Sequence, residues 1–203
     1  MPAAAAAPAL PDPATLPLGQ QERRDRIVHA AFALLERGEY DAIQMRDVAR
    51  EAGVALATIY RYFSSKDHLL AETLVEWAAE LGTKVSRKPP KGERVSDRVV
   101  DVLRRATRAM EIQPKLSEAV VTALSSTDPH AARCQREVGD VMNGIIASAF
   151  PGDFDPHTRD DIVRVLGHVW FSSLVGWVNR WYGINHVGDE VEIAAHLLLD
   201  QYD

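Results

Sequence analysis

The sequence predicts an all-α protein of about nine helices, with a three-helix N-terminal domain and a larger C-terminal helical domain. Apolar residues recur at the i, i+3, i+4 spacing of a helix through most of the chain, and no segment alternates as a confident strand. Pro and Gly residues fall between these periodic segments, where helices begin and end. The order of the segments then defines the two domains.

Residues 1–19 are rich in Ala and Pro and show no helical or strand period. Prolines oppose a regular helix because they lack an N–H and clash with the preceding turn. We therefore expect a disordered arm over 1–19, a helix-turn-helix domain over 20–67 and a second domain over 68–203. The arm has no Lys or Arg, which favours a plain tail over a DNA-binding arm.

Three helices are expected in the N-terminal domain. The first spans Gln20–Arg37 and ends at Gly38, and the second spans Met45–Ala52, with its apolar residues on one stripe. Gly53 then provides a turn, because glycine tolerates the positive φ at which many helices end. The third helix spans Leu56–Tyr62, and its buried anchors are at positions 59 and 63.

The third helix directs unusual side chains outward. Methyl groups, a hydroxyl, aromatic rings and a cation are what a recognition helix presents to the DNA major groove. We expect base-edge contacts from positions 56–58 and phosphate contacts from Tyr60, Tyr62 and Lys66. The complete set of expected DNA-binding residues is Arg46, Leu56, Ala57, Thr58, Tyr60, Arg61, Tyr62 and Lys66.

The charge distribution is compatible with this interpretation, although the chain has a net charge of −6. Between positions 44 and 66 there are four cations and two anions, which gives a local charge of +2. A locally basic face on an acidic body suits a selective DNA-binding protein more than a general nucleic-acid coat.

A fourth helix, Lys66–Val85, is expected to join the two domains, with Ser65 as its N-cap. Its N-terminus presents free N–H groups that suit a phosphate. After the Pro- and Gly-containing break at 86–92, further helices are predicted with a loop at Gly183–Gly188. These helices are Glu93–Ile112, one opened by Pro114, one opened by Pro129, Asp155–Tyr182 and Asp189–Gln201.

The second domain contains no motif for catalysis, metal binding or a cofactor, so none of these is expected. His168 lies on an apolar helix and is expected to be a hydrogen-bonded core residue, and Cys134 an idle buried thiol. No apolar run reaches the ~20 residues of a membrane span, and no secretory signal precedes the first helix. We therefore expect a cytoplasmic protein without a membrane partner.

The helix Asp155–Tyr182 is apolar nearly all round, with three tryptophans on a broad face. Such a helix needs cover on several sides, which favours a role shared between a subunit interface and a cavity for an apolar small-molecule effector. The expected cavity residues are large and often flexible side chains. They are Met110, Leu124, Met142, Phe150, Trp170, Phe171, Leu174 and Trp177.

Two stretches carry a specific family resemblance. The run TIYRYFSSKDHLL at 58–70, with RDVA at 46–49 before AGV at 52–54, resembles the signature of the TetR family of transcriptional repressors. The resemblance covers about 24–74 and implies double-stranded operator DNA as a partner. It also implies a homodimer formed by the last two long helices. One departure is Ala55, where the family often has Ser or Thr as an N-cap.

The resemblance extends into the second domain. RAM at 108–110, PKLSEA at 114–119 and VWFSSL at 169–174 resemble TetR-type repressors of sterol (cholesterol) catabolism in actinomycetes. This resemblance implies release from the operator by a sterol-derived CoA thioester or a related metabolite. The alternative left open by the residues is a small all-α enzyme or lipid-binding protein whose helix-turn-helix is only structural.

Overall fold

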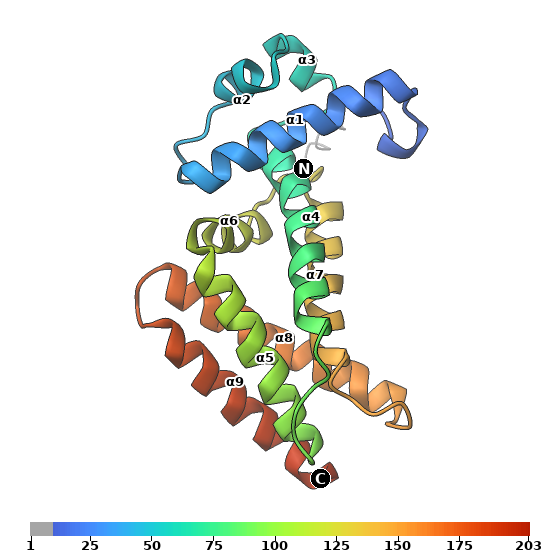
Figure 1. Ribbon diagram of the computed structural model, residues 1–203, viewed down its shortest axis with the longest axis vertical. Helices are drawn as coiled ribbons and strands as arrows, with labels where there is room; N and C mark the ends of the chain where they lie inside the picture. Colours follow the sequence, from blue (N-terminus) through green and yellow to red (C-terminus); the bar gives the residue numbers. More distant parts are fainter. Residues whose placement is uncertain (1–9) are drawn as a thin grey trace, which may run out of the picture.

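The computed structural model describes residues 10–203 and shows nine α-helices in that range (Figure 1). No strand occurs among the described residues, and the predicted all-α fold is confirmed. Two short 3₁₀ helices lie near the ends of this range, η1 (Pro13–Thr15) and η2 (Asp200–Tyr202). The α-helices are α1 (Leu18–Arg37), α2 (Met45–Ala52), α3 (Leu56–Tyr60), α4 (Lys66–Ser86), α5 (Val95–Ile112), α6 (Pro114–Leu124), α7 (Ala132–Ala147), α8 (Pro156–Val178) and α9 (Ile184–Leu199).

The segment before α1 differs from the predicted arm, of which residues 1–9 lie outside the described range. Asp12 caps η1, because its carboxylate accepts a hydrogen bond of 3.0 Å from the backbone N–H of Ala14. Leu16 is buried in the core, and α1 begins at Leu18. Residues 10–19 are therefore structured, because the capped proline turn places an apolar side chain on the first domain.

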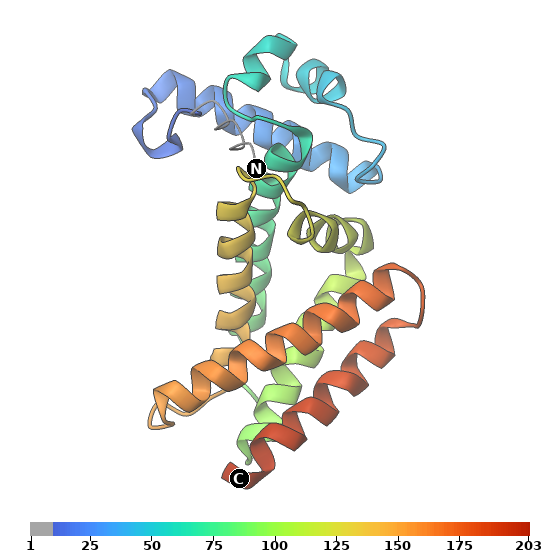
Figure 2. The same ribbon diagram turned by 180° about the vertical axis from the view of Figure 1, so that it is seen from behind.

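Helices α1, α2 and α3 form a compact unit across one end of α4 (Figures 1 and 2). Gly53 ends α2 with φ +64°, a left-handed conformation that glycine adopts without strain. Val48, Ile59 and Phe63 are fully buried between these helices. α3 ends at Tyr60, two residues earlier than predicted, because residues 62 and 63 turn into the core.

The long helix α4 crosses the predicted domain boundary at 67/68 and packs lengthwise against α7 (Figure 2). Gly82 allows this close approach, because a Cβ there would lie 3.1 Å from Val141 Cγ1. The buried face of α4 includes Leu74 and Trp77, as its period predicts. The helix therefore belongs to both domains.

Helices α5, α8 and α9 form the far end of the molecule (Figure 1). α7 starts at Ala132 rather than near Pro129, and the loop predicted at Gly183–Gly188 is helical from Ile184 onward. The turn between α8 and α9 is shorter than predicted because Tyr182 folds back over Gly176, where the missing Cβ leaves room for its ring.

Candidate nucleic-acid interface and ligand cavity

The outer surface of α3 brings most of the expected DNA-binding side chains together. Leu56 and Tyr60 are 41% and 49% exposed. Ala57 and Arg61 are also exposed, and Thr58 is half-buried. Because Ile59 is fully buried beneath them, the core holds this outer face in place.

Arg46 is exposed on α2, beside the recognition helix, and makes no ion pair among the described residues. Its guanidinium therefore remains available to a base edge or a phosphate. Ala55, at the N-cap position of α3, provides no side-chain hydrogen bond, as the departure from the family pattern predicts.

Tyr62 does not belong to this surface. Its side chain is 4% exposed, and its hydroxyl is enclosed without a hydrogen-bond partner. The backbone turns inward after α3 and packs the Tyr62 ring beside Phe63, with 6.4 Å between the ring centroids. The predicted phosphate contact from Tyr62 is therefore wrong.

Lys66 lies half-buried at the start of α4. Its ammonium donates a hydrogen bond of 3.2 Å to the backbone carbonyl of Tyr40 and lies 5.0 Å from the centroid of the Tyr40 ring. Ser65 is the predicted N-cap, since its hydroxyl accepts a hydrogen bond of 3.0 Å from the N–H of His68. A phosphate contact from Lys66 stays a prediction, because the ammonium already has local partners.

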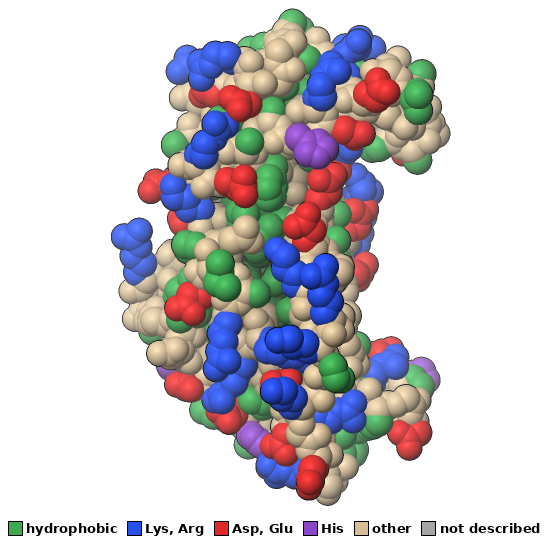
Figure 3. Space-filling view, viewed as in Figure 1, with side chains coloured by type: hydrophobic (Ala, Val, Ile, Leu, Met, Phe, Trp, Pro, Cys, Tyr) green, Lys and Arg blue, Asp and Glu red, His purple; other side chains and the backbone are tan. Residues whose placement is uncertain are grey.

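Positive charge is not confined to the DNA-binding end. Figure 3 shows Lys and Arg side chains over the lower half of one face, across α5 and the connection from α4. Residues 84–108 contain nine cations and three anions. Ion pairs to Asp97, Asp101 and Glu192 neutralise three of these arginines. Local charge alone therefore does not identify the DNA-binding surface.

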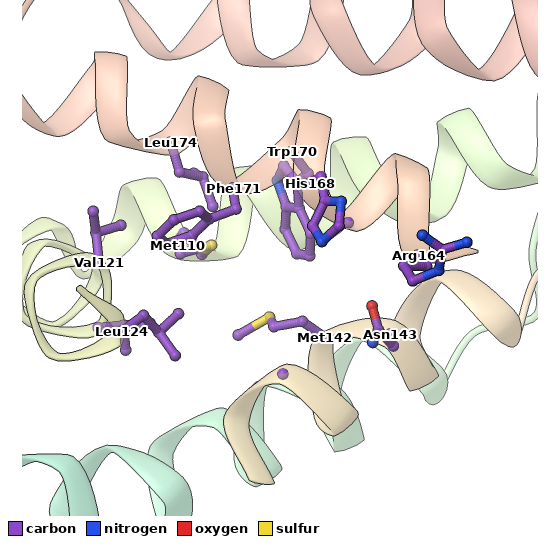
Figure 4. Close-up of a pocket in the computed structure, with 13 residues that line it drawn as sticks. Met110, Val121, Leu124, Met142, Asn143, Arg164, His168, Trp170, Phe171 and Leu174 are labelled. Atoms are coloured by element: carbon purple, nitrogen blue, oxygen red, sulfur yellow. The ribbon is translucent and has the colours of Figure 1, made fainter. Parts of the chain in front are cut away.

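A cavity of about 220 Å³ lies among α5, α6, α7 and α8 (Figure 4). Trp170 forms part of its wall and is held by a hydrogen bond of 3.0 Å from its indole N–H to the Thr107 hydroxyl. Six of the eight side chains predicted to line a cavity do so. They are Met110, Leu124, Met142, Trp170, Phe171 and Leu174.

The other two predicted cavity residues lie elsewhere, so these two predictions are wrong. Phe150 follows the end of α7 and packs edge-to-face on Phe154, with 5.0 Å between the centroids. Trp177 lies beyond Leu174, the last cavity residue on α8, and is half-buried against the core. Helical period placed both on apolar faces, but it does not show where along a helix a cavity ends.

The cavity has a polar end that sequence reasoning missed. Asn143, Arg164 and His168 lie at one end, and Val121 and Leu124 lie at the other (Figure 4). Arg164 forms an ion pair of 2.7 Å with Asp161 and is exposed. The spacing of 164, 168 and 171 on one face of α8 was the available signal.

His168 and Cys134 have contrasting environments. His168 is exposed at the cavity and has no hydrogen bond among the described residues, so the predicted hydrogen-bonded core histidine is wrong. Cys134 is fully buried, and burial raises the pKa of its thiol to about 12. Its thiol is thus protonated and unreactive at neutral pH, as expected.

Two family descriptions match the chain. "Bacterial regulatory proteins, tetR family" matches residues 27–73, and "Tetracyclin repressor-like, C-terminal domain" matches residues 92–198. The chain belongs to the TetR family. It is a DNA-binding transcriptional repressor with a helix-turn-helix domain and a C-terminal domain of that family.

Relatives and solved structures agree with this assignment. The HTH-type transcriptional repressor KstR of Rhodococcus jostii is 39% identical over 182 residues, which are 89% of this chain and 84% of the relative. A TetR transcriptional regulator from Rhodococcus sp. RHA1 has a TM-score of 0.77 and 29% identity, covering 91% of this chain and 100% of that chain.

A third match is the TetR-family repressor FadR of Thermus thermophilus in complex with lauroyl-CoA. Its TM-score is 0.64 at 22% identity, covering 86% of this chain and 92% of that chain. At this identity, the match shows a shared fold. Across residues 10–203, no helix combines the length and apolar character that crossing a membrane requires.

Proposed function

We propose that this TetR-family repressor binds its operator as a two-fold dimer and is released by an amphipathic effector, a sterol-derived CoA thioester. The main support for an amphipathic effector is the cavity, which has an apolar end at Val121 and Leu124 and a polar end at Arg164. Fused sterol rings match the apolar end, and anionic phosphates match the guanidinium.

The size of the cavity suggests how binding acts on the protein. At about 220 Å³, the cavity is smaller than the roughly 300–1,000 Å³ typical of ligand sites, so a sterol must widen it. Met110 and Met142 are flexible enough to move aside. Because α6 and α7 form two walls, widening displaces these helices relative to α4.

Two similarities to other proteins support a sterol-derived CoA thioester. The fold is shared with FadR of Thermus thermophilus, whose solved structure contains lauroyl-CoA. The segments at 108–119 and 169–174 resemble repressors of sterol catabolism, and they contain the cavity residues Met110, Trp170, Phe171 and Leu174. The first similarity supports the thioester, and the second supports the sterol body.

Operator contacts come from the outer faces of α2 and α3. Leu56 and Ala57 suit thymine methyl groups, Thr58 offers a hydroxyl to a base edge, and Arg46 suits a guanine. Tyr60 and Arg61 are placed to hold phosphates. The exposure of these side chains supports the proposed roles, with Thr58 half-buried among them, and the burial of Tyr62 argues against a phosphate contact from that residue.

A dimer interface on α8 and α9 is supported by exposed apolar residues. Leu197 is 79% exposed, Ile193 is 56% exposed and Val165 is 37% exposed. Two recognition helices must lie about 34–36 Å apart to enter successive major grooves, which a two-fold dimer can provide. Leu198, in contrast, packs against the core and contributes to folding.

Replacing Leu197 with Arg should therefore weaken the dimer without unfolding the chain. A two-fold axis places the substitution in the interface twice, so we expect the dissociation constant to rise at least about tenfold. Sedimentation velocity over a concentration series measures this change. An unchanged dimer, with the same melting temperature, would place the interface elsewhere.

The effector class is tested by fluorescence anisotropy on DNA from upstream of the chain's own gene. A steroid side-chain acid is supplied as its CoA thioester, as the free acid and as a neutral sterol. We expect the thioester to lower operator affinity at least about tenfold, corresponding to ~1.4 kcal/mol of preference for the released state. The neutral sterol should have the weakest effect.

Arg164→Gln should raise the thioester concentration needed for release, because the anionic head loses its guanidinium. Arg159→Gln is the matched control, since Arg159 is on the same helix, pairs with Asp160 and does not line the cavity. If the thioester concentration needed for release rose equally in both variants, Arg164 would not contact the effector. No retardation of DNA at any salt concentration would favour the alternative of an enzyme or lipid-binding protein.

A further inference from the structure

One buried carboxylate connects the DNA-binding domain to the ligand-binding domain. Glu72 on α4 is 9% exposed and receives the guanidinium of Arg24 from α1 at 2.6 Å. It also pairs with Arg133 from α7 and lies 3.7 Å from the imidazole Nε2 of His68. A single side chain therefore binds one arginine from each domain.

The loop between α6 and α7 makes two further contacts with the DNA-binding domain. The Ser126 hydroxyl donates a hydrogen bond of 2.9 Å to Asp67, which also accepts one of 2.9 Å from the Tyr40 hydroxyl. The Ser65 hydroxyl donates to Asp128. We use the term interdomain clamp for the contacts Glu72–Arg24, Glu72–Arg133, Asp67–Ser126 and Ser65–Asp128.

Burial of Glu72 favours a role in positioning over a role in stability alone. An apolar residue of similar size would often be as stable as a buried ion pair, so the energy of the pair does not explain its presence. Burial raises the pKa of Glu72, but the neighbouring His68 imidazole and the Arg24 and Arg133 guanidiniums outweigh it and lower the pKa to about 2. The carboxylate is therefore ionised and holds both arginines at neutral pH.

The clamp is attached to the helices that wall the cavity. Val121 and Leu124 on α6 and Met142 on α7 line it, and the loop that carries Ser126 and Asp128 connects these two helices. Arg133 lies on the first turn of α7. Movement of α6 and α7 around a ligand therefore reaches the DNA-binding domain through these contacts.

We propose that the interdomain clamp sets the orientation of the DNA-binding domain on the ligand-binding domain, with Glu72 as its central positioning residue. In the ligand-free state, the clamp holds the recognition helix in the orientation that docks on DNA. Ligand binding shifts α6 and α7 and transmits that shift through Arg133 and the loop. The ligand-dependent part of this inference rests on the proposed function, while the orienting role does not.

The test compares Arg133→Gln with Arg94→Gln. The two side chains are matched in exposure, at 47% and 49%, and each pairs with a carboxylate three or four residues along the chain. Arg94, the N-cap residue of α5, has its second partner in Asp200, whereas Arg133 also pairs with Glu72. We expect Arg133→Gln to weaken operator binding at least about threefold without ligand. We also expect it to reduce the thioester-induced loss of affinity from about tenfold to under about threefold. Arg94→Gln should match the wild type in both.

Glu72→Gln separates positioning from simple electrostatics. It raises the net charge by one, which alone would strengthen DNA binding, whereas Arg133→Gln lowers the charge by one. The clamp predicts that both variants bind operator more weakly, while a pure charge effect predicts opposite directions and would overturn the proposal. Arg133→Lys, which retains a cation, should restore most of the wild-type behaviour.

The melting temperature of each variant shows whether it is folded. If Glu72→Gln does not fold, the two single variants Ser126→Ala and Arg133→Gln test whether the clamp orients the DNA-binding domain. Wild-type affinities and ligand response in both of those folded variants would contradict the clamp. If the wild type does not respond to the thioester, the proposed effector is wrong. The ligand-free affinities then still decide whether the clamp orients the DNA-binding domain.

Discussion

The proposed DNA-binding surface and the proposed ligand cavity use their side chains in opposite ways. On α3, Leu56 and Tyr60 stand outside a closed core whose members, including Ile59 and Phe63, are fully buried. In the cavity, Met110 and Trp170 are themselves core residues, with exposures of 0% and 2%. Function and stability are therefore separable on the proposed DNA-binding surface and inseparable in the buried part of the cavity wall.

The difference has a physical origin. A groove in DNA is contacted by residues on the protein surface, so these residues need only a rigid core beneath them. The sterol body of the proposed effector would instead be surrounded by side chains such as Met110 and Trp170, which pack together in its absence. A ligand can therefore change the structure, because it replaces contacts that the core itself uses.

The largest expected effect tests the cavity side of this comparison. Trp170→Ala removes a buried indole and leaves the Thr107 hydroxyl without its partner, so we expect a loss of about 3–5 kcal/mol in the free energy of unfolding. Urea denaturation measures it. Trp181→Ala is the control, because that tryptophan is 71% exposed and should change stability by less than about 0.5 kcal/mol. Similar losses in both would show that Trp170 is not part of a packed wall.

A smaller effect is expected on the DNA-binding side. Tyr60→Ala should change the free energy of unfolding by less than about 0.5 kcal/mol, because the ring is half exposed. It should weaken operator binding at least about tenfold, equivalent to ~1.4 kcal/mol. Anisotropy and denaturation on the same preparation measure both quantities. A large loss of stability with unchanged DNA binding would show that Tyr60 contributes to folding and not to operator contact.

The smallest effect concerns the clamp that joins the two regions. The folded-state pKa of Glu72, about 2, lies below its ordinary value of 4.5, so the unfolded chain binds more protons in acid. The stabilisation is complete well above pH 4.5, begins to fall as the pH approaches that value and is lost as the pH falls toward 2. Between pH 5 and pH 4, Glu72 should account for a loss on the order of 1 kcal/mol in the free energy of unfolding. Wild type and Glu72→Gln with the same pH dependence in this range would contradict the assigned environment.

The sequence was most informative where contacts are local. The 3.6-residue period identifies which face of α2, α3 and α4 is buried, because neighbours on a helix face are three or four residues apart. Gly53 at the turn, Ser65 as an N-cap and Ile59 as a buried anchor all follow from such short-range rules. The signature at 58–70 lies within one such segment, so family membership could be inferred from it.

Tyr62 shows where short-range rules end. Extending α3 by two residues placed this ring on the outer face, whereas packing beside Phe63 turns the backbone inward. The cavity shows the same limit. Its residues come from four helices, and only their assembly excludes Phe150 and adds Arg164 and His168 to the polar end.

The sequence alone determined most of the helices, their buried faces and the family, because each depends on residues close together in the chain. The tertiary structure decided the extent and polarity of the cavity and the convergence of Arg24, Glu72 and Arg133. These residues are separated by 48 and 61 positions in the sequence, so no local pattern links them. Their meeting depends on how α1 and α7 pack against α4, which is set by the whole buried core.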